Sequence, residues 1–403
     1  MNKVFRGKKY FTEALWEALL KCSGWITSIV ILLIVVFLFS EGGGFFSKDK
    51  VEEGYVLSVS KSNNVKKLTA LQVKDIFDGK ITSWRSLGAN VQEDQILVMD
   101  MDGIASYASD SELEDESNIP KVINKVMNQH PNIITFVPKE YTQEGFSQRT
   151  IEMGKENVKD FLVGRQWFPT AEPVALFGVL PIVLGTLWVS LGAILLALPF
   201  GLAVAIYCAE LASDRMHKII KPVIELLAGI PSVVYGFFGL IVIVPMVQKL
   251  FSLDVGETAL SASIVLAIMA LPTIITIAED ALRSTPQSMK EASLALGANR
   301  WQTISKVVVP YSISGITAAV VLGIGRAIGE TMAVLMVSGN AAVMPHTFLA
   351  PVRTIPATIA AELGEAPKGG LHYEALFLLG CILFIMTLII NLVVDYVGKK
   401  KMC

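Results

Sequence analysis

An arginine and a glutamate, Arg326 and Glu330, interrupt an otherwise apolar stretch that runs from Ser312 to Val337. At the depth of a lipid bilayer such a charge costs about 3 kcal/mol or more, so intramembrane charges pair with one another or line the path of a polar solute. A guanidinium stays charged at any working pH and offers planar, paired donors that match a tetrahedral oxyanion. We predict that Arg326 binds an oxyanion that has shed water, and that Glu330 either holds Arg326 when the anion is absent or lowers the cost of a lone cation.

The spacing of Arg326 and Glu330 leaves a structural alternative open. On one helix, residues four apart share a face and can form an ion pair. The order of the two, Arg before Glu, is the less favourable one for simple helix support, which favours the solute path. An ion pair that only joins two spans remains the alternative, and it predicts that loss of Arg326 lowers the amount of protein rather than its activity.

The composition of the whole chain is that of a membrane protein. Of its 403 residues 53% are hydrophobic and 17% charged, and the formal net charge is −2. This predicts an all-α polytopic membrane protein rather than a set of soluble domains. Helix-length apolar runs predict six transmembrane helices. They lie at 24–40, 186–208 (after an interfacial segment from 175), 222–247, 260–277, 312–337 and 375–397.

Basic residues indicate which side of the membrane each end of the chain faces. They mark the N-terminal segment 1–23, the tail 399–403 and the loop 282–310. By the positive-inside rule, both termini are expected in the cytoplasm, in a multi-pass protein of the inner (plasma) membrane. Because no small-x-small cleavage site follows the first apolar run, we expect residues 24–40 to be an uncleaved anchor.

The segment 41–171 has the composition of a soluble domain and is expected outside the cytoplasm. Strand-like runs occur at 54–60 and 132–138, and Thr69 is placed to cap a helix over 70–77 that Gly79 closes. These features predict an α/β insert between the first and second spans. The remaining residues, 172–398, contain spans two to six.

The loop 282–310 predicts a helix-turn-helix that protrudes into the cytoplasm. Alanines and leucines from Ala292 to Ala298 suggest a short amphipathic helix, and Gly297 allows the chain to turn into a second one. Such a projection needs a partner to dock into. Glu291 is either an ion-pair partner in that contact or an acid favoured by the dipole of its own helix.

A glycine-rich motif lies in the predicted third span. Small residues at such spacing let helix backbones approach, and proline bends a helix, so packing or gating is expected here rather than contact with a solute. The residues concerned are Gly229, Pro231, Ser232, Gly236 and Gly239.

Several kinds of chemistry find no support in the sequence. The four cysteines and four histidines are not spaced as a disulfide framework or as metal ligands. No Gly-x-x-x-x-Gly-Lys-Ser/Thr motif occurs, so the chain is not expected to hydrolyse ATP itself. We predict no metal, no cofactor and no enzymatic activity.

Three motifs together resemble a known family. Glu291-Ala-Ser-x-x-x-Gly297, followed by Val307-x-Val309-Pro310, resembles the EAA loop of ABC-transporter permeases, whose pattern ends Ile-x-Leu-Pro. With Leu227 to Gly239 and Gly325-Arg-Ala-Ile-Gly-Glu-Thr-Met332, residues 172–400 are similar to the phosphate-specific permeases of the PstC type. The resemblance implies the type I importer fold of six transmembrane helices.

The same resemblance implies roles and partners. Glu291, Ala292 and Gly297 would couple the chain to separate ATP-hydrolysing subunits, and Arg326 and Glu330 would serve phosphate passage. The implied partners are a homologous, PstA-like second permease, two ATP-binding subunits, an extracytoplasmic phosphate-binding protein and membrane lipid, with no nucleic acid.

A second resemblance concerns the insert. Residues 68–88 are similar to a stretch of periplasmic phosphate-binding proteins, which cradle phosphate in a Gly-Ser-Gly-Thr turn at a helix N-terminus. Here the corresponding region, 101–109, lacks that turn, and the carboxylates of Asp100, Asp102 and Asp110 would repel an oxyanion. We predict a degenerate, non-binding lobe that docks or shields.

These inferences predict the permease subunit of an ABC importer for inorganic phosphate. Three alternatives remain open: a permease for another oxyanion such as molybdate or sulfate, a secondary transporter or channel without an ATPase, and a phosphate-sensing membrane receptor built around residues 41–170.

Overall fold

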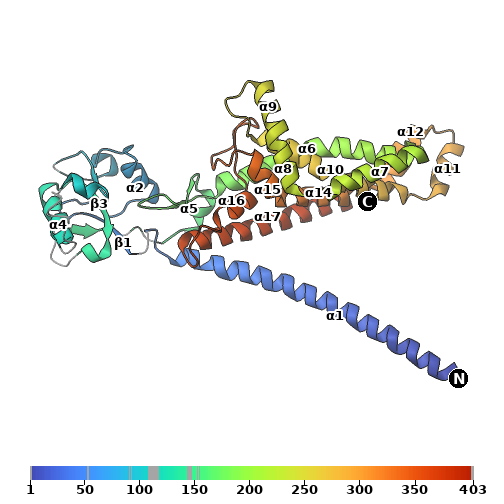
Figure 1. Ribbon diagram of the computed structural model, residues 1–403, viewed down its shortest axis with the longest axis horizontal. Coiled ribbons are helices and arrows are strands. Elements are labelled where there is room, and N and C mark those ends of the chain that lie inside the picture. Colours follow the sequence, from blue (N-terminus) through green and yellow to red (C-terminus); the bar gives the residue numbers. More distant parts are fainter. Residues whose placement is uncertain are drawn as a thin grey trace. The chain divides into compact units, whose positions relative to one another are not determined.

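The computed structural model describes residues 2–51, 54–89, 91, 93–107, 118–142, 148–151, 153 and 155–400, with the side chains of 2–15, 395 and 397–400 left out. Met1, Asp110 and residues 401–403, which belong to predicted segments above, lie outside the described residues. The chain divides into two compact units (Figure 1). The first is helical and comprises Met1–Gly44, Ile182–Ala341 and Pro345–Cys403, and the second comprises Phe45–Pro181 with Ala342–Met344.

The helices of the first unit are separated by short loops and by three π-helical turns. In chain order the helices are α1 Asn2–Gly43, α6 Leu180–Ile206, α7 Asp214–Gly229, α8 Ser232–Phe238, α9 Val244–Phe251, α10 Ala259–Arg283, α11 Gln287–Ala295, α12 Arg300–Thr303, α13 Val309–Tyr311, α14 Ile313–Gly329, α15 Met332–Val337, α16 Ile355–Glu362 and α17 Leu371–Lys400. The π-helical turns are η6 Tyr207–Leu211, η7 Gly239–Ile243 and η8 Ile304–Val308.

The number of membrane-crossing helices agrees with the predicted six-span fold. Among the described residues, five helical segments are long and apolar enough to span, and a pair bent by 70° makes a sixth if it is counted as one span. The five are Trp16–Ser47, Leu180–Leu211, Ser232–Phe251, Ala259–Arg283 and Leu371–Val394, and the bent pair is Arg300–Tyr311 with Ile313–Gly329.

Two predicted spans are wrong as continuous helices, and in both the backbone becomes extended at the break. The third, at 222–247, is divided because Pro231 cannot continue α7 and forces the residue before it out of the helical region. Ile230 accordingly has ψ 128° and Pro231 ψ 143°. The fifth, at 312–337, is divided at Glu330, where ψ is 131°.

The start of the second span also differs from its prediction. The interfacial segment expected from 175 does not form as one piece, because Leu176–Phe177 is a strand and α6 already begins at Leu180. The whole run Leu180–Leu211 is apolar enough to cross as a single long helix.

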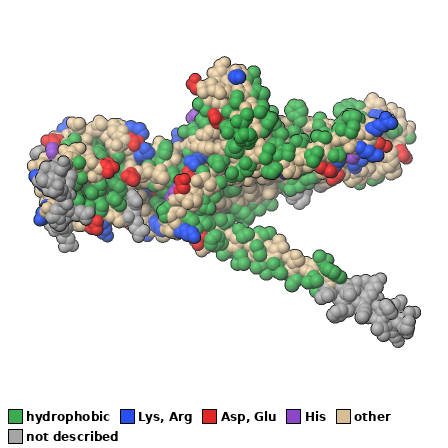
Figure 2. Space-filling view, in the orientation of Figure 1, with side chains coloured by type: hydrophobic (Ala, Val, Ile, Leu, Met, Phe, Trp, Pro, Cys, Tyr) green, Lys and Arg blue, Asp and Glu red, His purple; other side chains and the backbone are tan. Residues whose placement is uncertain are grey.

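Helix α10 lies at the centre of the first unit. Most of its length is buried, and its small residues let neighbouring helices approach. A side chain at Gly323 of α14 would stand 2.8 Å from the Ile274 side chain of α10. By contrast, the described side chains of α1 are mostly exposed and apolar (Figure 2), as expected of a helix that faces lipid.

The second unit contains the predicted α/β elements. Its main sheet has the order β2-β3-β1-β4, in which β3 pairs antiparallel with β1 and parallel with β2. These strands are β1 Tyr55–Ser60, β2 Leu97–Met99, β3 Ile133–Pro138 and β4 Gln148–Thr150. A two-stranded sheet of β5 Trp167–Phe168 and β6 Leu176–Phe177 and the helices α2 Ala70–Phe77, α4 Ile119–Gln129 and α5 Val158–Val163 complete the unit. The predicted strands at 54–60 and 132–138 are confirmed to within one residue.

Alternation along β3 builds a core on each face of the sheet. Successive side chains of a strand point to opposite faces. Ile134 and Phe136 belong to the apolar cluster that contains α2, and Ile133 and Val137 to the cluster that contains α4. The sheet is therefore covered by a helix on each side.

The predicted cap of α2 is confirmed as a capping box. The Gln72 N–H donates to Thr69 Oγ1 at 3.2 Å, and the Thr69 N–H donates to Gln72 Oε1 at 2.9 Å. Past the other end, Gly79 takes a left-handed φ of 71°, a backbone conformation that glycine adopts without strain.

We expect Thr69→Ala to destabilise α2 by about 1 kcal/mol, because the first-turn amides lose their acceptor. Hydrogen exchange of the 70–77 amides in the full-length protein measures this. Thr82→Ala, at an exposed threonine outside the helix, is the matched control. Equal protection in both variants would contradict the prediction.

Candidate functional site

Arg326 lies near the C-terminal end of α14 and faces α10. Its Nη1 donates to Thr273 Oγ1 at 3.4 Å, and the arginine is half-buried. Thr273 follows Pro272, which lies inside α10. Among the described residues, the guanidinium donates to this one neutral oxygen of a second helix, and a guanidinium has five N–H donors in all.

Glu330 lies in the break after α14, not on it. Its Oε1 accepts a bond from the Ala333 N–H at 3.4 Å, so the carboxylate lies over the first turn of α15. The prediction that Arg326 and Glu330 share one helix face is wrong, because the helix ends at Gly329 and the face does not continue. In the part of the chain that the structure describes, no ion pair joins the two side chains.

A cavity of about 550 Å³ opens beside this break. Gly329 and Thr331 come from the break itself, and the rest of the lining comes from α16, the residues just after it and α17. Its lining residues are Gly329, Thr331, Pro356, Ile359, Ala360, Leu363, Gly364 and Leu383. In membrane proteins, non-helical backbone at bilayer depth occurs where it lines a cavity or is buried in protein, and broken helices form the sites of many transporters.

The glycines of the third span divide into two kinds. A Cβ at Gly236 would stand 2.8 Å from Met336 Sδ and 2.9 Å from Ala333 Cα, and at Gly239 2.6 Å from Val265 Cγ2. These two lie where α8 and η7 meet α15 and α10. Gly229 has no atom within 4 Å of that position and is exposed, so the structure does not place it at a helix interface.

The bend at Pro231 and Ser232 is held by a tyrosine that sequence reasoning did not single out. Tyr235 of α8 is buried, and its hydroxyl donates to the Leu227 carbonyl of α7 at 2.8 Å. Pro231 precedes the first residue of α8, Ser232, as a proline that starts rather than continues a helix.

We expect Gly239→Ala to destabilise the protein by about 1–3 kcal/mol through overpacking, since the added methyl group meets Val265 and Val337. Thermal unfolding in detergent measures the effect. Gly229→Ala in the same motif should leave the unfolding temperature unchanged, because the added methyl group meets no atom within 4 Å. The packing role would be refuted by equal unfolding temperatures for the two variants.

The predicted helix-turn-helix in the loop 282–310 is present as α11 and α12. Glu291 and Ala292 are exposed on α11, and Gly297 turns the chain with φ 87°. Helix α12 then starts behind a capping box in which Asn299 Oδ1 accepts from the Gln302 N–H at 2.8 Å.

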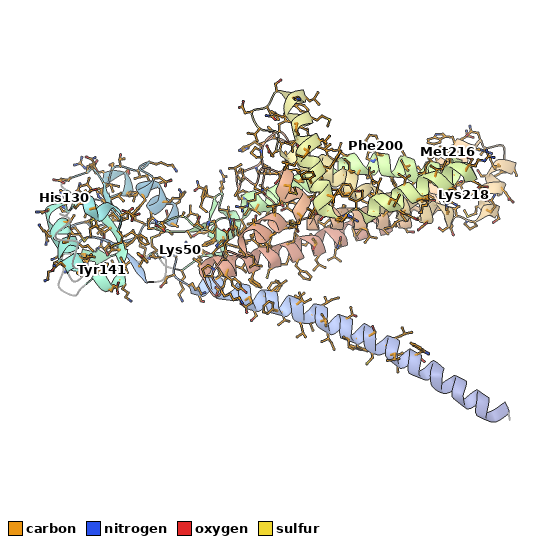
Figure 3. The ribbon with its side chains drawn as sticks, in the orientation of Figure 1. Lys50, His130, Tyr141, Phe200, Met216 and Lys218 are labelled. Carbon is orange, nitrogen blue, oxygen red and sulfur yellow. The ribbon has the colours of Figure 1, made fainter. Side chains whose placement is uncertain are left out.

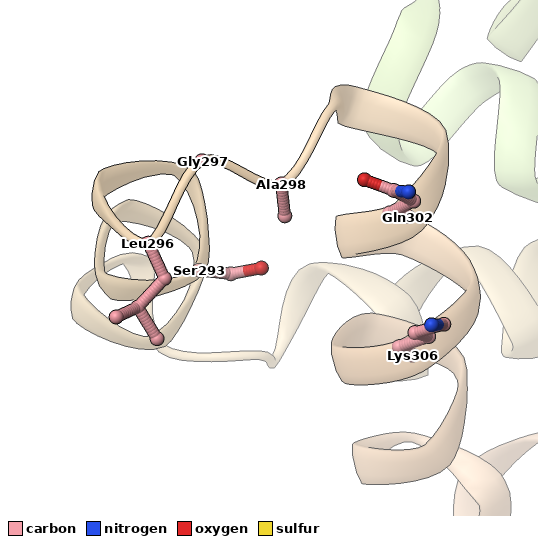
Figure 4. Close-up of a pocket in the computed structure, with 6 residues that line it drawn as sticks. All are labelled: Ser293, Leu296, Gly297, Ala298, Gln302 and Lys306. Carbon is pink, nitrogen blue, oxygen red and sulfur yellow. The ribbon is translucent and has the colours of Figure 1, made fainter.

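A polar hollow of about 270 Å³ lies between the two helices of this loop. Figure 4 shows Ser293, Leu296, Gly297 and Ala298 on one side and Gln302 and Lys306 on the other. Two large apolar side chains of the loop are open to solvent, Leu296 at 90% and Trp301 at 65% exposure. Exposed apolar groups beside a hollow are typical of a docking surface.

The structure also brings together charges that the sequence analysis did not connect. Glu279 of α10 is only 1% exposed. It accepts bonds from Lys221 Nζ at 3.1 Å and Arg283 Nε at 2.9 Å, and His217 Nε2 lies 2.7 Å from its Oε1. One signal was available: Glu279 precedes Arg283 by four residues, the favourable order on a helix.

In the insert, the region that corresponds to the anion-binding turn has a different local structure. Asp100 Oδ1 accepts from the Gly103 N–H at 2.6 Å, at the start of the 3₁₀ turn η3 (Gly103–Ser106). The Asp100 carboxylate therefore accepts the hydrogen bond of the Gly103 amide, which is then not available to a bound anion. Asp110 lies outside the described residues.

Cysteine, histidine and acidic side chains do not gather into a metal site within the described ranges, where no group of three or more could hold an ion. Cys22 is exposed, and Cys208 and Cys381 are buried, all three as free thiols.

Comparisons with known proteins agree on one class. The family model described as "Binding-protein-dependent transport system inner membrane component" matches residues 197–402. A probable ABC transporter permease protein, YqgH of Bacillus subtilis, is 42% identical over 243 residues, covering 60% of this chain and 78% of that protein. The phosphate transport system permease protein PstC of Mesorhizobium japonicum is 38% identical over 255 residues, covering 59% of this chain and 77% of that protein.

A solved structure is similar to a smaller part of the chain. It is a putative phosphate ABC transporter substrate-binding protein from Clostridium perfringens, with bound phosphate, at 27% identity over 27% of this chain and 49% of that one. The TM-score between the two is 0.20.

Proposed function

Because the chain belongs to the family of binding-protein-dependent transport system inner membrane components, we propose that it is the ABC permease subunit that passes inorganic phosphate into the cytoplasm. The similarity to the phosphate permease of Mesorhizobium japonicum supports phosphate as the solute. The observation that carries the proposal is a half-buried guanidinium, Arg326, close to the break after α14.

The chemistry of Arg326 fits this role. Phosphate must shed water to cross, and a guanidinium replaces part of that water with paired, charge-assisted hydrogen bonds. Thr273 orients the group from α10 at 3.4 Å without neutralising it. Glu330 accepts a hydrogen bond from the first turn of α15 and forms no ion pair with Arg326 among the described residues, so an anion at Arg326 does not have to displace a bound carboxylate.

Energy for transport comes from other chains in this proposal. The loop with Glu291, Ala292 and Gly297 presents an exposed docking surface, and two ATP-binding subunits are the proposed partners there. A PstA-like second permease and an extracytoplasmic phosphate-binding protein complete the assembly. The insert shields or docks and does not bind phosphate, both termini face the cytoplasm, and the chain itself has no ATPase activity.

We expect Arg326→Gln to leave the protein level unchanged and to lower phosphate uptake by at least about tenfold, since hydrogen bonds to charged groups contribute about 1.5–3 kcal/mol. Labelled-phosphate uptake and immunoblotting of the same membranes measure both quantities. Arg165→Gln, at an exposed arginine of the second unit, is the control. A parallel fall in level and uptake would instead identify Arg326 as a structural charge.

The solute and the assembly are tested separately. In vesicles that contain the purified complex, excess unlabelled phosphate should abolish labelled uptake, whereas sulfate and molybdate should not. Affinity purification in mild detergent should recover an attached ATP-binding chain. Uptake driven by an ion gradient, with no such chain attached, would refute the ABC mechanism.

A further inference from the structure

A buried ion pair ties the docking loop to the end of a membrane helix. Lys290 Nζ of α11 lies 2.6 Å from Glu210 Oε1, in the turn that ends α6. The two side chains are only 16% and 12% exposed. The pair is thus largely removed from water, unlike a surface ion pair.

The turn that carries Glu210 is also held from α10. It is the π-helical turn η6, whose wider hydrogen-bonding pattern is a feature often found at functional sites. Arg283, the last residue of α10, donates from Nη2 to the Cys208 carbonyl in this turn at 2.9 Å. Lys290 of α11 and Arg283 of α10 therefore both bind to the turn η6.

Arg283 is itself oriented by the buried carboxylate of Glu279. Glu279 receives Arg283 Nε on one oxygen and the Lys221 amine on the other, with His217 of α7 beside it. One carboxylate thereby joins α7 to α10 and aims Arg283 at the turn after α6. Figure 2 shows charged side chains gathering at the end of the helical unit where α11 and α12 lie, and Figure 3 labels Met216 and Lys218 on α7 there.

Stability alone does not account for this arrangement. Apolar side chains of the same volume often stabilise a protein as well as a buried ion pair does, because the charges lose hydration. Hydrogen-bonded ion pairs differ from apolar contacts in being directional, so they fix the position of one element relative to the other. Without them, α11 would be connected to the membrane helices through the short chain segments on either side of the docking loop and through packing.

We propose that Glu210 and Lys290 form a strap that carries movement of α11 into α6, and that Glu279 is a positioning residue that keeps Arg283 and α7 on the same turn. This inference rests on the proposed function, because the movement originates in the ATP-binding subunits. The helices α6, α7, α10 and α11 then move together when the docking loop is displaced.

Charge reversal and charge exchange test the strap in the reconstituted full complex. Lys290→Glu or Glu210→Lys should leave ATP hydrolysis present but lower the phosphate taken up per ATP by about tenfold, within the usual range of coupling between sites. The double exchange, Glu210→Lys with Lys290→Glu, should restore the ratio. Lys218→Glu, at an exposed lysine of α7, is the control. An unchanged ratio in both single variants, or no restoration in an assembled double variant, would overturn the strap.

Two milder substitutions test the strap even if the charge-reversal variants do not assemble into the complex. Lys290→Met keeps a long side chain and removes the charge, and Glu279→Gln keeps the shape of the carboxylate. Both should lower uptake per ATP while the complex stays assembled. Wild-type ratios in these two variants would also overturn the proposal.

A readout that needs no phosphate separates this inference from the proposed function. Phe200 is exposed on α6 (Figure 3). A spin label on Phe200→Cys, in a background with Cys22→Ser and Cys403→Ser, should change its spectrum when ATP is added to the complex. Lys290→Glu should abolish that change, and the double exchange should recover it. If the wild type shows this spectral change but takes up no phosphate, the proposal that phosphate is the solute is refuted and the strap is not. If the spectral change persists in Lys290→Glu, the strap is refuted.

Discussion

The cost of removing charge from water is the constraint on which the helical unit depends. Buried charges require close partners of the opposite sign or strong hydrogen bonds. Glu279 meets this requirement with three basic neighbours, and Glu210 with one lysine at 2.6 Å. Arg326, by contrast, has no acidic partner among the described residues and donates to the neutral hydroxyl of Thr273 at 3.4 Å. This remaining donor capacity is what the proposed role of Arg326 in phosphate passage rests on.

Interrupted helices give the unit its functional geometry. Pro231 divides the third span, and the extended backbone at Glu330 divides the stretch around Arg326. Each break releases backbone groups that a continuous helix would use, and each is held by neighbours, Tyr235 at the first and Glu330 itself at the second. At bilayer depth, non-helical backbone of this kind occurs where it is buried in protein or lines a cavity, and a cavity lies beside the second break.

The two ends of the docking loop are anchored by different forces. On the α12 side, a capping box at Asn299 and a hydrogen bond between Ser293 and Thr303 at 3.0 Å organise the loop locally. On the α11 side, the ion pair with Glu210 reaches to a residue 80 positions earlier in the chain. The loop therefore has hydrogen bonds within itself and an ion pair to the turn that ends α6. Its outer surface, with Leu296 and Trp301, stays open for another chain.

Local and compositional features of this protein could be read from the sequence. Apolar runs predicted the spans at 260–277 and 375–397, because helix-length hydrophobicity is a property of the segment itself. Thr69 predicted a cap, and period-two alternation predicted β1 and β3, because these signals act over a few residues. The motif around Gly297 predicted a helix-turn-helix for the same reason.

The tertiary structure decided what depends on contact between distant segments. The apolar run 312–337 predicted a fifth span that continues through Glu330, and a continuous helix would put Arg326 and Glu330 on one face. The prediction failed because an apolar run carries no information about a break in the backbone. Whether Gly229, Gly236 or Gly239 lies at an interface depends on which helix is adjacent. The partners of Glu279 and Lys290 come from residues tens of positions away, and only folding brings them within hydrogen-bonding distance.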